Sequence, residues 1–575
     1  MENIEKIRHS LAHIMAQVVL EFWPKTKIGM GPAIENGFYY DFDFVTPPTP
    51  ADLAKIEDRM QEIIRQGQKF EKEEISKIKA KKLFSNQKYK LELISELPGK
   101  TVTIYTSGNF VDLCKGPHIK STKDIDVNAF KLTKIAGAYW KGDEKNKMLT
   151  RIYAAAFASE KELSDYTNML AEAEKRDHRV LGKTLKLFTI SDLIGAGLPL
   201  LQPNGMILRK EIEDCLWDLH KNKGYSRVWT PHITKKGLYE TSGHAAKFGD
   251  ELFRVKGGNE DFFLKPMNCP HHMQIFSDNQ FSYRDMPVRY FEPATIYRYE
   301  KTGELSGLTR VRAVTQDDGH LFCRVSQITQ EVDTIVDIIR EFYTTMKMLE
   351  GYWVRLSVRG KDKSKYIGSD QAWKKAEAAL KEAAEKNNLN YKRVEGEAAF
   401  YGPKLDFMFK DAIGREWQLA TIQCDFNLPE RFDLSFVNEK GEKERPVVIH
   451  RAISGSLERF MGVMIEHFAG AFPVWLAPVQ VAIIPISEKH LHYAHKIKKE
   501  LQENNIRFEL KDENETLGKK IRAAEMQKIP YLLVIGDKEI DANAVSVRER
   551  GKGDLGQMAA EKFIEKIKDG IIRRS

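Results

Sequence analysis

The stretch "YFEPATIYRYEKTGELSGLTRVRAVTQDDGH", residues 290–320, predicts a strand, a glycine-containing turn and a second strand. Arg298 and Glu300 fall on the first expected strand, and Arg310 falls on the second. Two arginines that face each other across a hairpin suit a polyphosphate, because guanidinium groups bind phosphate oxygens bidentately. Such pairs also form surface salt bridges, which is the interpretation favoured by a hairpin taken alone.

A second arginine-bearing segment, "HRAISGSLERF" (450–460), opens an amphipathic helix whose Arg459 is expected to reach the same pocket. The chain has no G-x-x-x-x-G-K-[ST] pattern, which argues against a P-loop nucleotide site. "GKGDLG" (551–556) matches a dinucleotide fingerprint, but no second strand with an acidic residue follows it. We predict a turn there.

Two segments carry residues with zinc-ligand chemistry. "NCPHH" (268–272) places Cys269 beside two histidines, in a chain whose five scattered cysteines predict reduced thiols. Near the N-terminus, His9 and His13 lie four apart on one face of an expected helix. Cys114 and His118 of "DLCKGPH" have the same spacing. The two N-terminal pairs have the ligand types of a tetrahedral zinc site, and chance occurrence is the alternative.

The bulk composition is that of a soluble globular protein of about three or four domains. The chain has 575 residues, of which 42% are hydrophobic and 30% charged, and its net charge is +8. It has no run of roughly 20 unbroken apolar residues, and its first residues are charged. These features predict a cytoplasmic protein without a membrane segment. The small basic excess permits nucleic-acid binding and does not establish it.

The pattern along the chain predicts four segments. Residues 1–160 form the first domain, and a charged helix over 161–182, ending at Gly182, links it to a mixed region over 183–474. "TPPTP" (46–50) is predicted to be a loop. Strands alternate with helices over 475–575, which predicts an α/β domain with a largely parallel sheet.

Taken together, these motifs resemble the class II aminoacyl-tRNA synthetases, and in particular their threonyl branch. "GYSRVWTPHI" (224–233), which includes Pro231, resembles motif 1, and the hairpin and "GSLERF" resemble motifs 2 and 3. "FLKPMNCP", "TQDDGH", "AFYGPK" and "VIHRA" are typical of the threonyl branch. The resemblance spans nearly the whole chain. It implies a multidomain α/β and α+β protein with an N-terminal editing domain, an antiparallel-sheet catalytic domain and a C-terminal α/β anticodon-binding domain.

The resemblance also implies a reaction. The family activates L-threonine with ATP and Mg²⁺ to threonyl-adenylate and transfers it to the 3′ end of tRNA(Thr), working as a homodimer formed through motif 1. Its catalytic zinc is held by residues that match Cys269, His320 and His450, so His271 and His272 are expected to pack or face solvent. Three protein ligands leave an open coordination position. Threonine can offer both its amino group and its hydroxyl to the metal, whereas valine lacks the hydroxyl.

The resemblance assigns roles within the activation site. Arg298 would bind the α-phosphate, Arg310 the γ-phosphate, Glu300 the adenine amino group and Arg459 the other adenine face, so that catalysis rests on positioning and electrostatics. Val314 stands where the family carries a phenylalanine that stacks on adenine. Gln316, Asp318, Tyr401, Gln418 and Ser456 are expected to frame the amino acid. Lys404 and Thr421 are expected to lie near it, and Met267 is a further expected substrate-binding residue.

Zinc cannot reject serine, which lacks only a methyl group, a difference of about 1–3 kcal/mol. The N-terminal segment resembles the threonyl editing domain, which hydrolyses mischarged seryl-tRNA(Thr). We interpret His9, His13, Cys114 and His118 as editing residues rather than metal ligands, with Asp112, Lys90 and Tyr40 lining the pocket. A related alanyl editing fold nevertheless binds zinc with this pattern. In the C-terminal domain, Glu539 and Arg548 are expected to read anticodon bases.

Three other functions fit the sequence less well. A synthetase-like RNA-binding regulator would have lost a motif arginine or a zinc ligand, and this chain retains them. A free-standing editing hydrolase would lack motifs 2 and 3, and a seryl or prolyl enzyme would lack the Cys269, His320 and His450 set. Many relatives carry a small extra domain before the editing domain, which is expected to be missing because eight residues precede His9.

Overall fold

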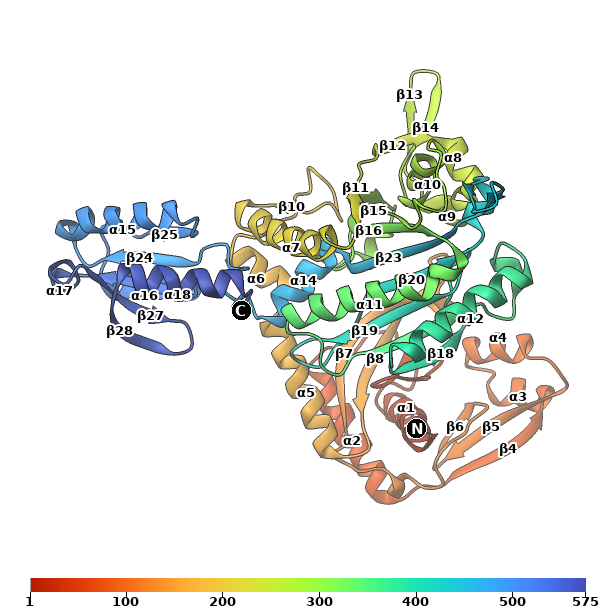
Figure 1. Cartoon of the computed structure of the whole chain (residues 1–575). Coiled ribbons are helices and arrows are strands. Elements are labelled where there is room, and N and C mark those ends of the chain that lie inside the picture. Colours follow the sequence, from red (N-terminus) through yellow and green to blue (C-terminus); the bar gives the residue numbers. More distant parts are fainter. Residues whose placement is uncertain (1) are drawn as a thin grey trace. The chain divides into compact units, whose positions relative to one another are not determined.

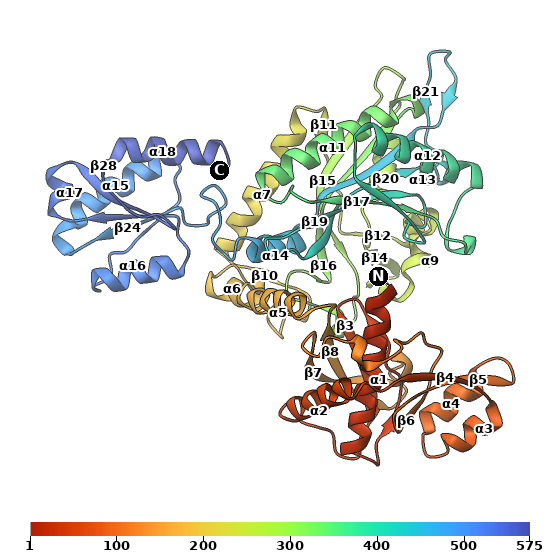
Figure 2. The same ribbon diagram turned by 90° about the horizontal axis from the view of Figure 1, so that it is seen from below.

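The computed structural model describes residues 2–575, which form two compact units divided between residues 172 and 173 (Figures 1 and 2). The division falls inside helix α5 (Glu160–Lys175). Within the described residues, all five cysteines are free thiols, as predicted. No helix in this part of the chain has the length and apolar character needed to cross a membrane.

The N-terminal unit is built on a long helix, α1 (Glu2–Phe22), which packs against an antiparallel sheet of order β1-β3-β8-β7, with β2 paired to β3. Ile7, Leu11, Ile14 and Val18 recur at helical spacing along α1 and are all buried. The predicted loop at 46–50 joins β3 to the next helix. The remaining elements are β1 (Lys27–Ile28), β2 (Ala33–Ile34), β3 (Gly37–Asp43), α2 (Asp52–Gln66), β7 (Phe130–Tyr139) and β8 (Met148–Ala156).

A second, smaller sheet in the same unit has the order β4-β5-β6 and its own apolar core. Asp112 lies on its strand β6, and Cys114 follows directly after that strand. Lys90 lies on a neighbouring helix and is almost fully buried. The elements are β4 (Phe70–Ser76), α3 (Lys77–Leu83), α4 (Lys88–Glu96), β5 (Thr101–Ser107) and β6 (Phe110–Leu113).

The predicted single linker helix is wrong, because the chain breaks into α5 and α6 (His178–Thr184). The Asp177 carboxylate accepts a hydrogen bond from the Arg179 backbone N–H at 2.8 Å, which caps a new helix start. Gly182 lies inside α6 rather than at a helix end. A Cβ there would lie 2.3 Å from Phe188, so the glycine permits close packing.

The C-terminal unit contains the expected catalytic sheet, of order β11-β15-β16-β23-β20-β19-β17-β18. Only its two outer pairings are parallel, so the predicted antiparallel class is confirmed. The strands are β11 (Tyr225–Arg227), β15 (Val288–Tyr297), β16 (Ala313–Cys323), β17 (Trp353–Val358), β18 (Tyr391–Glu395), β19 (Lys404–Lys410), β20 (Glu416–Asp425) and β23 (Val447–Ser456). The helices that share a core with the sheet are α7 (Pro203–Lys221), α11 (Ile328–Thr345), α12 (Asp370–Lys386) and α14 (Leu457–His467).

The motif hairpin differs from its prediction in where its charged residues lie. β15 and β16 pair antiparallel from Val288 opposite Phe322 to Tyr297 opposite Ala313. Arg298, Glu300 and Arg310 therefore lie in the connection over 298–312 and not on the strands. The connection is rich in glycine and charged residues, which favour turns, and it includes the short 3₁₀ helix η4 (Thr302–Glu304).

A small subdomain beside this sheet supplies the cysteine. Its three-stranded sheet has the order β12-β14-β13, and Cys269 begins helix α10 with Pro270 in the first turn. The elements are β12 (Ile233–Lys235), α8 (Lys236–Ser242), α9 (His244–Phe248), β13 (Arg254–Gly257), β14 (Glu260–Leu264) and α10 (Cys269–Ser277). Shorter elements of this unit are β9 (Phe188–Thr189), β10 (Leu200–Leu201), α13 (Leu428–Arg431), β21 (Phe436–Val437) and β22 (Lys443–Glu444).

The C-terminal sheet has the order β25-β24-β26-β27-β28 and is mixed rather than largely parallel. The five-residue helix α17 between β26 and β27 is too short for a crossover, so the strands pair antiparallel. Of the 551–556 segment, only Gly551 and Lys552 form the predicted turn, and Gly553 begins β28, a strand that was not predicted. The elements are β24 (Val481–Pro485), α15 (Leu491–Glu503), β25 (Phe508–Leu510), α16 (Leu517–Met526), β26 (Tyr531–Ile535), α17 (Asp537–Asp541), β27 (Ala544–Glu549), β28 (Gly553–Ala559) and α18 (Ala560–Ile572).

Candidate active and metal sites

Strand register brings together the three residues predicted to hold a metal. His320 on β16 lies directly opposite His450 on β23, which places both imidazoles on the same face of the sheet. Cys269 approaches from the start of α10. One ligand atom from each of the three lies within 4.8 Å of the others, and all three residues are buried.

His450 has one ring nitrogen committed to a partner outside this triad. Its Nε2–H donates to Asp425 Oδ2 at 3.0 Å. The other Asp425 oxygen accepts from the backbone N–H groups of Asn427 and Leu428, at 2.7 and 3.0 Å. This arrangement orients the imidazole and leaves Nδ1 as the nitrogen open to a metal.

His320 is oriented in the same way, by His272. His272 Nδ1 lies 2.8 Å from His320 Nδ1, and His272 Nε2 lies 3.0 Å from Glu292 Oε2. Burial acts to raise the pKa of Glu292, but hydrogen bonds from His272 and Asn268 and the charge of Lys265 outweigh it and lower that pKa to about 2. His272 packs in the interior, as expected, but it also belongs to a chain of polar contacts that ends on a carboxylate.

The donor set fits zinc. One thiol and two imidazoles are ligands that zinc prefers. His450 has a carboxylate, the common outer partner of a metal-bound imidazole, and His320 reaches a carboxylate through His272. Burial raises the pKa of the Cys269 thiol well above its ordinary value, and a bound cation would stabilise the thiolate. By contrast, His271 is buried, and neither of its ring nitrogens has a hydrogen-bond partner among the described residues.

A cavity of about 710 Å³ opens beside the triad and reaches both His320 and His450. It is lined by every residue predicted to frame the amino acid, by Met267 and Thr421 but not Lys404, and by all four residues predicted to bind ATP. Asp318 is buried here, and within the described residues its Oδ2 has no hydrogen-bond partner. Burial raises the pKa of this carboxyl, so a cationic group brought into the cavity would find an unsatisfied acceptor.

Asp406 on β19 organises one wall of the cavity and was not predicted. It is fully buried and accepts hydrogen bonds from Lys404 at 2.7 Å, Gln418 at 2.9 Å and Thr421 at 3.2 Å. Lys404 therefore points to Asp406 rather than into the cavity. The available sequence signal was a lone carboxylate within the otherwise apolar core of "KLDFMFK".

The predicted ATP-binding residues lie at the other end of the cavity. Arg298 donates to Pro266 O at 3.3 Å and lies 2.7 Å from the sulfur of Met267, and burial lowers its pKa. Two nitrogens of the Arg310 guanidinium donate to one oxygen of Glu300, Oε2, at 2.7 and 2.9 Å. Arg459 lies over the Trp417 ring, 5.9 Å from its centroid.

Asp317, which sequence reasoning missed, holds the backbone that leads into motif 3. Its carboxylate accepts from the N–H groups of Ile453, Ser454 and Gly455, at 2.8, 3.1 and 2.9 Å. Asp317 is not among the residues that line the cavity, and its Oδ2 lies 3.8 Å from Arg451. It acts through the backbone that carries Ser456, where helix α14 begins.

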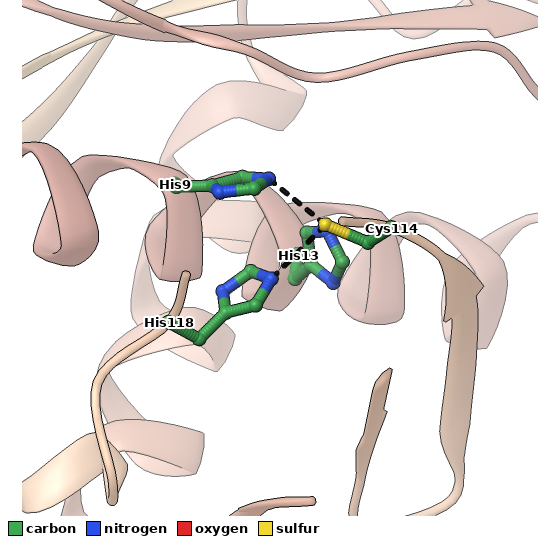
Figure 3. A group of neighbouring side chains, drawn as sticks. All are labelled: His9, His13, Cys114 and His118. Carbon is green, nitrogen blue, oxygen red and sulfur yellow. Dashed lines mark hydrogen bonds between the residues drawn. The ribbon is translucent and has the colours of Figure 1, made fainter. Parts of the chain in front are cut away.

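In the N-terminal unit, the four predicted editing residues form one cluster (Figure 3). Cys114 Sγ lies 3.2 Å from His9 Nε2 and 3.3 Å from His118 Nε2. Burial lowers the pKa of His118 to about 2 and raises the pKa of Cys114 to about 11. The cluster is therefore uncharged at neutral pH in the absence of a bound cation.

Asp112 connects this cluster to the other predicted editing residues. Its Oδ1 lies 2.5 Å from Lys90 Nζ, and its Oδ2 accepts from the Tyr40 hydroxyl at 2.6 Å. The same oxygen lies 3.7 Å from His13. Lys90, Tyr40 and Asp112 are all nearly inaccessible to solvent, so this charged pair is both desolvated and hydrogen-bonded.

The two predicted anticodon residues lie on neighbouring elements of the C-terminal sheet. Glu539 is on α17, where its carboxylate accepts from the Gly536 N–H at 2.9 Å and caps that helix. Arg548 is on β27, 3.9 Å from Asp554. In the predicted motif 1, α7 precedes β11, and Trp229 is 72% exposed.

Three family profiles match the chain. Residues 253–468 match the tRNA synthetase class II core domain (G, H, P, S and T), and residues 480–570 match an anticodon binding domain. Residues 102–153 match the threonyl and alanyl tRNA synthetase second additional domain. These matches cover the three segments that carry the sites described above.

Curated relatives are similar over nearly the full chain. A threonine–tRNA ligase of Porphyromonas gingivalis is 50% identical over 98% of this chain and 87% of its own length. One of Sulfurihydrogenibium sp. is 48% identical over 99% of this chain and 89% of its own length. Among solved structures, the RNA binding domain of threonyl-tRNA synthetase from Cryptosporidium parvum is 36% identical, covering 68% of this chain and 98% of its own, with a TM-score of 0.66.

Proposed function

The chain belongs to the threonine–tRNA ligase family, the ATP-dependent enzymes that join threonine to tRNA, and we propose that Cys269, His320 and His450 hold a zinc ion that selects the amino acid. When bound, this zinc supplies an open coordination position for a substrate that carries both an amino group and a hydroxyl. The fit of the donor set supports the assignment, because His450 is oriented by the Asp425 carboxylate and His320 by His272, which in turn contacts Glu292.

Side chains of the cavity wall make the remaining contacts that recognise the amino acid. The unsatisfied oxygen of Asp318 accepts from the substrate amino group, and Tyr401, Gln316 and Ser456 enclose the amino acid. Valine is excluded because it leaves buried polar groups in this wall without a partner. Asp406 keeps Gln418 and Thr421 in place.

Activation of the carboxylate rests on positioned positive charge, supplied by ATP-bound Mg²⁺ together with the arginines. Arg298 binds the α-phosphate and stabilises the charge that develops there as the threonine carboxylate attacks. Arg310 leaves Glu300 to bind the γ-phosphate, which frees Glu300 for the adenine amino group. Arg459 lies against the adenine. Together these contacts hold the two reactants in line.

We propose that the N-terminal cluster hydrolyses seryl-tRNA(Thr). The high pKa of Cys114 argues against a thiolate nucleophile at neutral pH, so the cluster orients the ester and an attacking water. His13 and the Asp112–Lys90 pair would hold the ribose and the amino group. Such a second site is required because a missing methyl group gives only about 1–3 kcal/mol of discrimination.

Binding of tRNA(Thr) through the C-terminal domain, with Glu539 and Arg548 reading bases, completes the proposal. We also propose a homodimer formed through motif 1, supported by the exposed indole of Trp229, and a cytoplasmic location. The alternative of a synthetase-like regulator has no support, since every motif arginine and proposed zinc ligand is in place.

The observation that carries the proposal is the convergence of the Cys269, His320 and His450 triad on a cavity lined by the motif arginines. Amino-acid-dependent ATP–pyrophosphate exchange tests it, with threonine, serine and valine, before and after zinc removal. We expect strong exchange with threonine, less with serine, almost none with valine, and loss on chelation that added zinc reverses. Exchange that persists in zinc-free protein would refute the metal assignment.

A further inference from the structure

His178, the first residue of α6, lies outside every motif discussed so far and is buried. The backbone N–H of Leu308 points at its Nε2, at 3.0 Å, and Glu466 Oε1 lies 2.6 Å from its Nδ1. An N–H can only donate, so Nε2 is the unprotonated nitrogen and Nδ1–H donates to Glu466. Both ring nitrogens therefore have defined roles.

Glu466, on α14, is held firmly enough to orient this ring. Its Oε1 also accepts from the His178 backbone N–H at 3.1 Å, and its Oε2 lies 2.5 Å from Arg415. Arg415 in turn pairs with Asp411 at 2.7 Å. The imidazole therefore has a fixed partner on one side and the motif 2 connection on the other.

The segment that His178 contacts is a closed turn over residues 306–310. Ser306 N–H donates to Arg310 O at 3.1 Å, and Arg310 N–H donates back to Ser306 O at 3.2 Å. Gly307 adopts a φ of 48°, and a Cβ there would lie 2.1 Å from His178 Nε2, so the turn backbone presses directly on the ring. Leu308 is fully buried, so the turn is anchored at its apex.

We propose that His178 is a positioning residue for ATP, which acts by fixing this turn and hence Arg310, the last residue of the turn. The inference rests on the proposed role of Arg310 in binding the γ-phosphate. Holding the turn in advance lowers the cost of ordering Arg310 when ATP binds. Because the turn contributes to the ATP end of the cavity, loss of the His178 acceptor weakens ATP binding selectively over threonine binding.

Two amide substitutions at His178 distinguish the role of its Nε2 from that of its Nδ1. In His178→Gln the side-chain amide reaches the position of Nε2 and can still accept from Leu308, whereas in His178→Asn it reaches only the position of Nδ1. We expect H178N to raise the KM for ATP in pyrophosphate exchange by about 3- to 10-fold, as loss of one buried hydrogen bond does. The KM for threonine should stay within about twofold, and H178Q should remain close to the parent protein.

Further variants control for general damage. His178→Phe keeps a ring near Phe188 and lacks the acceptor, so it should reproduce H178N. His467 is the residue after Glu466, and its ring contacts Phe468. The His467→Gln variant should leave the KM for ATP unchanged. Hydrogen exchange gives a second readout, because the Leu308 amide should lose protection in H178N and H178F but not in H178Q.

The outcomes distinguish this inference from the proposed function. If Arg310→Ala does not weaken ATP binding, the assigned role of Arg310 fails and the inference fails with it. If Arg310→Ala weakens ATP binding while H178N and H178F do not, only the inference fails. It is also overturned if H178N raises both KM values equally, or if H178Q is as impaired as H178N.

Discussion

Replacing His272 with phenylalanine tests whether the carboxylate-to-imidazole chain supports the proposed metal. The variant keeps a ring in a fully buried position and removes the contacts to His320 at 2.8 Å and to Glu292 at 3.0 Å. His320 then loses the partner that fixes its tautomer and ring orientation. The proposed metal ligands are themselves unchanged, so any effect on zinc comes from their support.

The expected loss is a 10- to 100-fold weaker zinc affinity, the usual effect of removing such an outer partner, or about 1.4–2.8 kcal/mol. The free energies of the two lost hydrogen-bond contacts of His272 lead to a similar loss of binding free energy. One buried neutral hydrogen bond contributes about 1 kcal/mol, and leaving a buried group unsatisfied costs about 1–3 kcal/mol. Glu292 keeps its contacts with Asn268 and Thr230, which limits the damage to the fold.

The assay is a zinc competition titration against a chromophoric chelator, with circular dichroism to show that the protein is folded. His271→Phe is the matched control, because this adjacent histidine is also buried but has no hydrogen-bond partner for either nitrogen within the described residues. We expect its zinc affinity to stay within about twofold of the parent protein. Equal losses in the two variants, or an unchanged affinity in His272→Phe, would refute the reasoning.

Three further changes have defined outcomes. Asp112→Asn removes the charged partner of buried Lys90, which keeps its contact with Tyr40. It should lower the unfolding free energy of the N-terminal unit by about 3–5 kcal/mol, measured by urea unfolding. No loss would show that the pair is not desolvated. Val314→Phe should lower the KM for ATP by about 2- to 10-fold, because the ring would stack on adenine with about 0.5–1.5 kcal/mol, and should leave the KM for threonine unchanged. A rise in the KM for ATP would mean that the ring clashes with the nucleotide. The pKa of Glu292 is lowered to about 2, so its charged form contributes stability above pH 4.5 that is lost as the pH falls toward 2. Glu292→Gln should therefore flatten the pH dependence of urea unfolding between pH 5 and 3, and parallel curves would contradict this.

Local chemistry was predictable where it depends on residues close in the chain. The i, i+4 spacing of His9 and His13 placed both on α1, and the alternation of strands and helices after residue 475 identified an α/β domain. Motif resemblance supplied the distant partners Cys269, His320 and His450, which spacing alone could not connect. The comparisons bear out the family, the fold class and the enzyme class.

The predictions failed where direction or pairing depends on tertiary contacts. Strand direction in the C-terminal sheet follows from how short the β26–β27 connection is, which composition does not reveal. The charged residues of motif 2 lie in the connection that follows β15, and the turn at 306–310 within it contacts His178, which is distant in the sequence. The contact of Lys404 with Asp406, two residues along β19 and therefore on the same face, was also not foreseen, because it depends on the burial of that carboxylate.

The sequence by itself therefore determined which reactive side chains this protein has and which of them share a helix or a motif. The tertiary structure alone decided which of them meet. The register of β16 against β23 sets His320 opposite His450, and the packing of α6 brings His178 to a backbone amide 130 residues away in the chain. The physical reason is that hydrogen bonds and metal coordination act over about 2–3 Å, a distance that only the folded core imposes on residues so far apart in sequence.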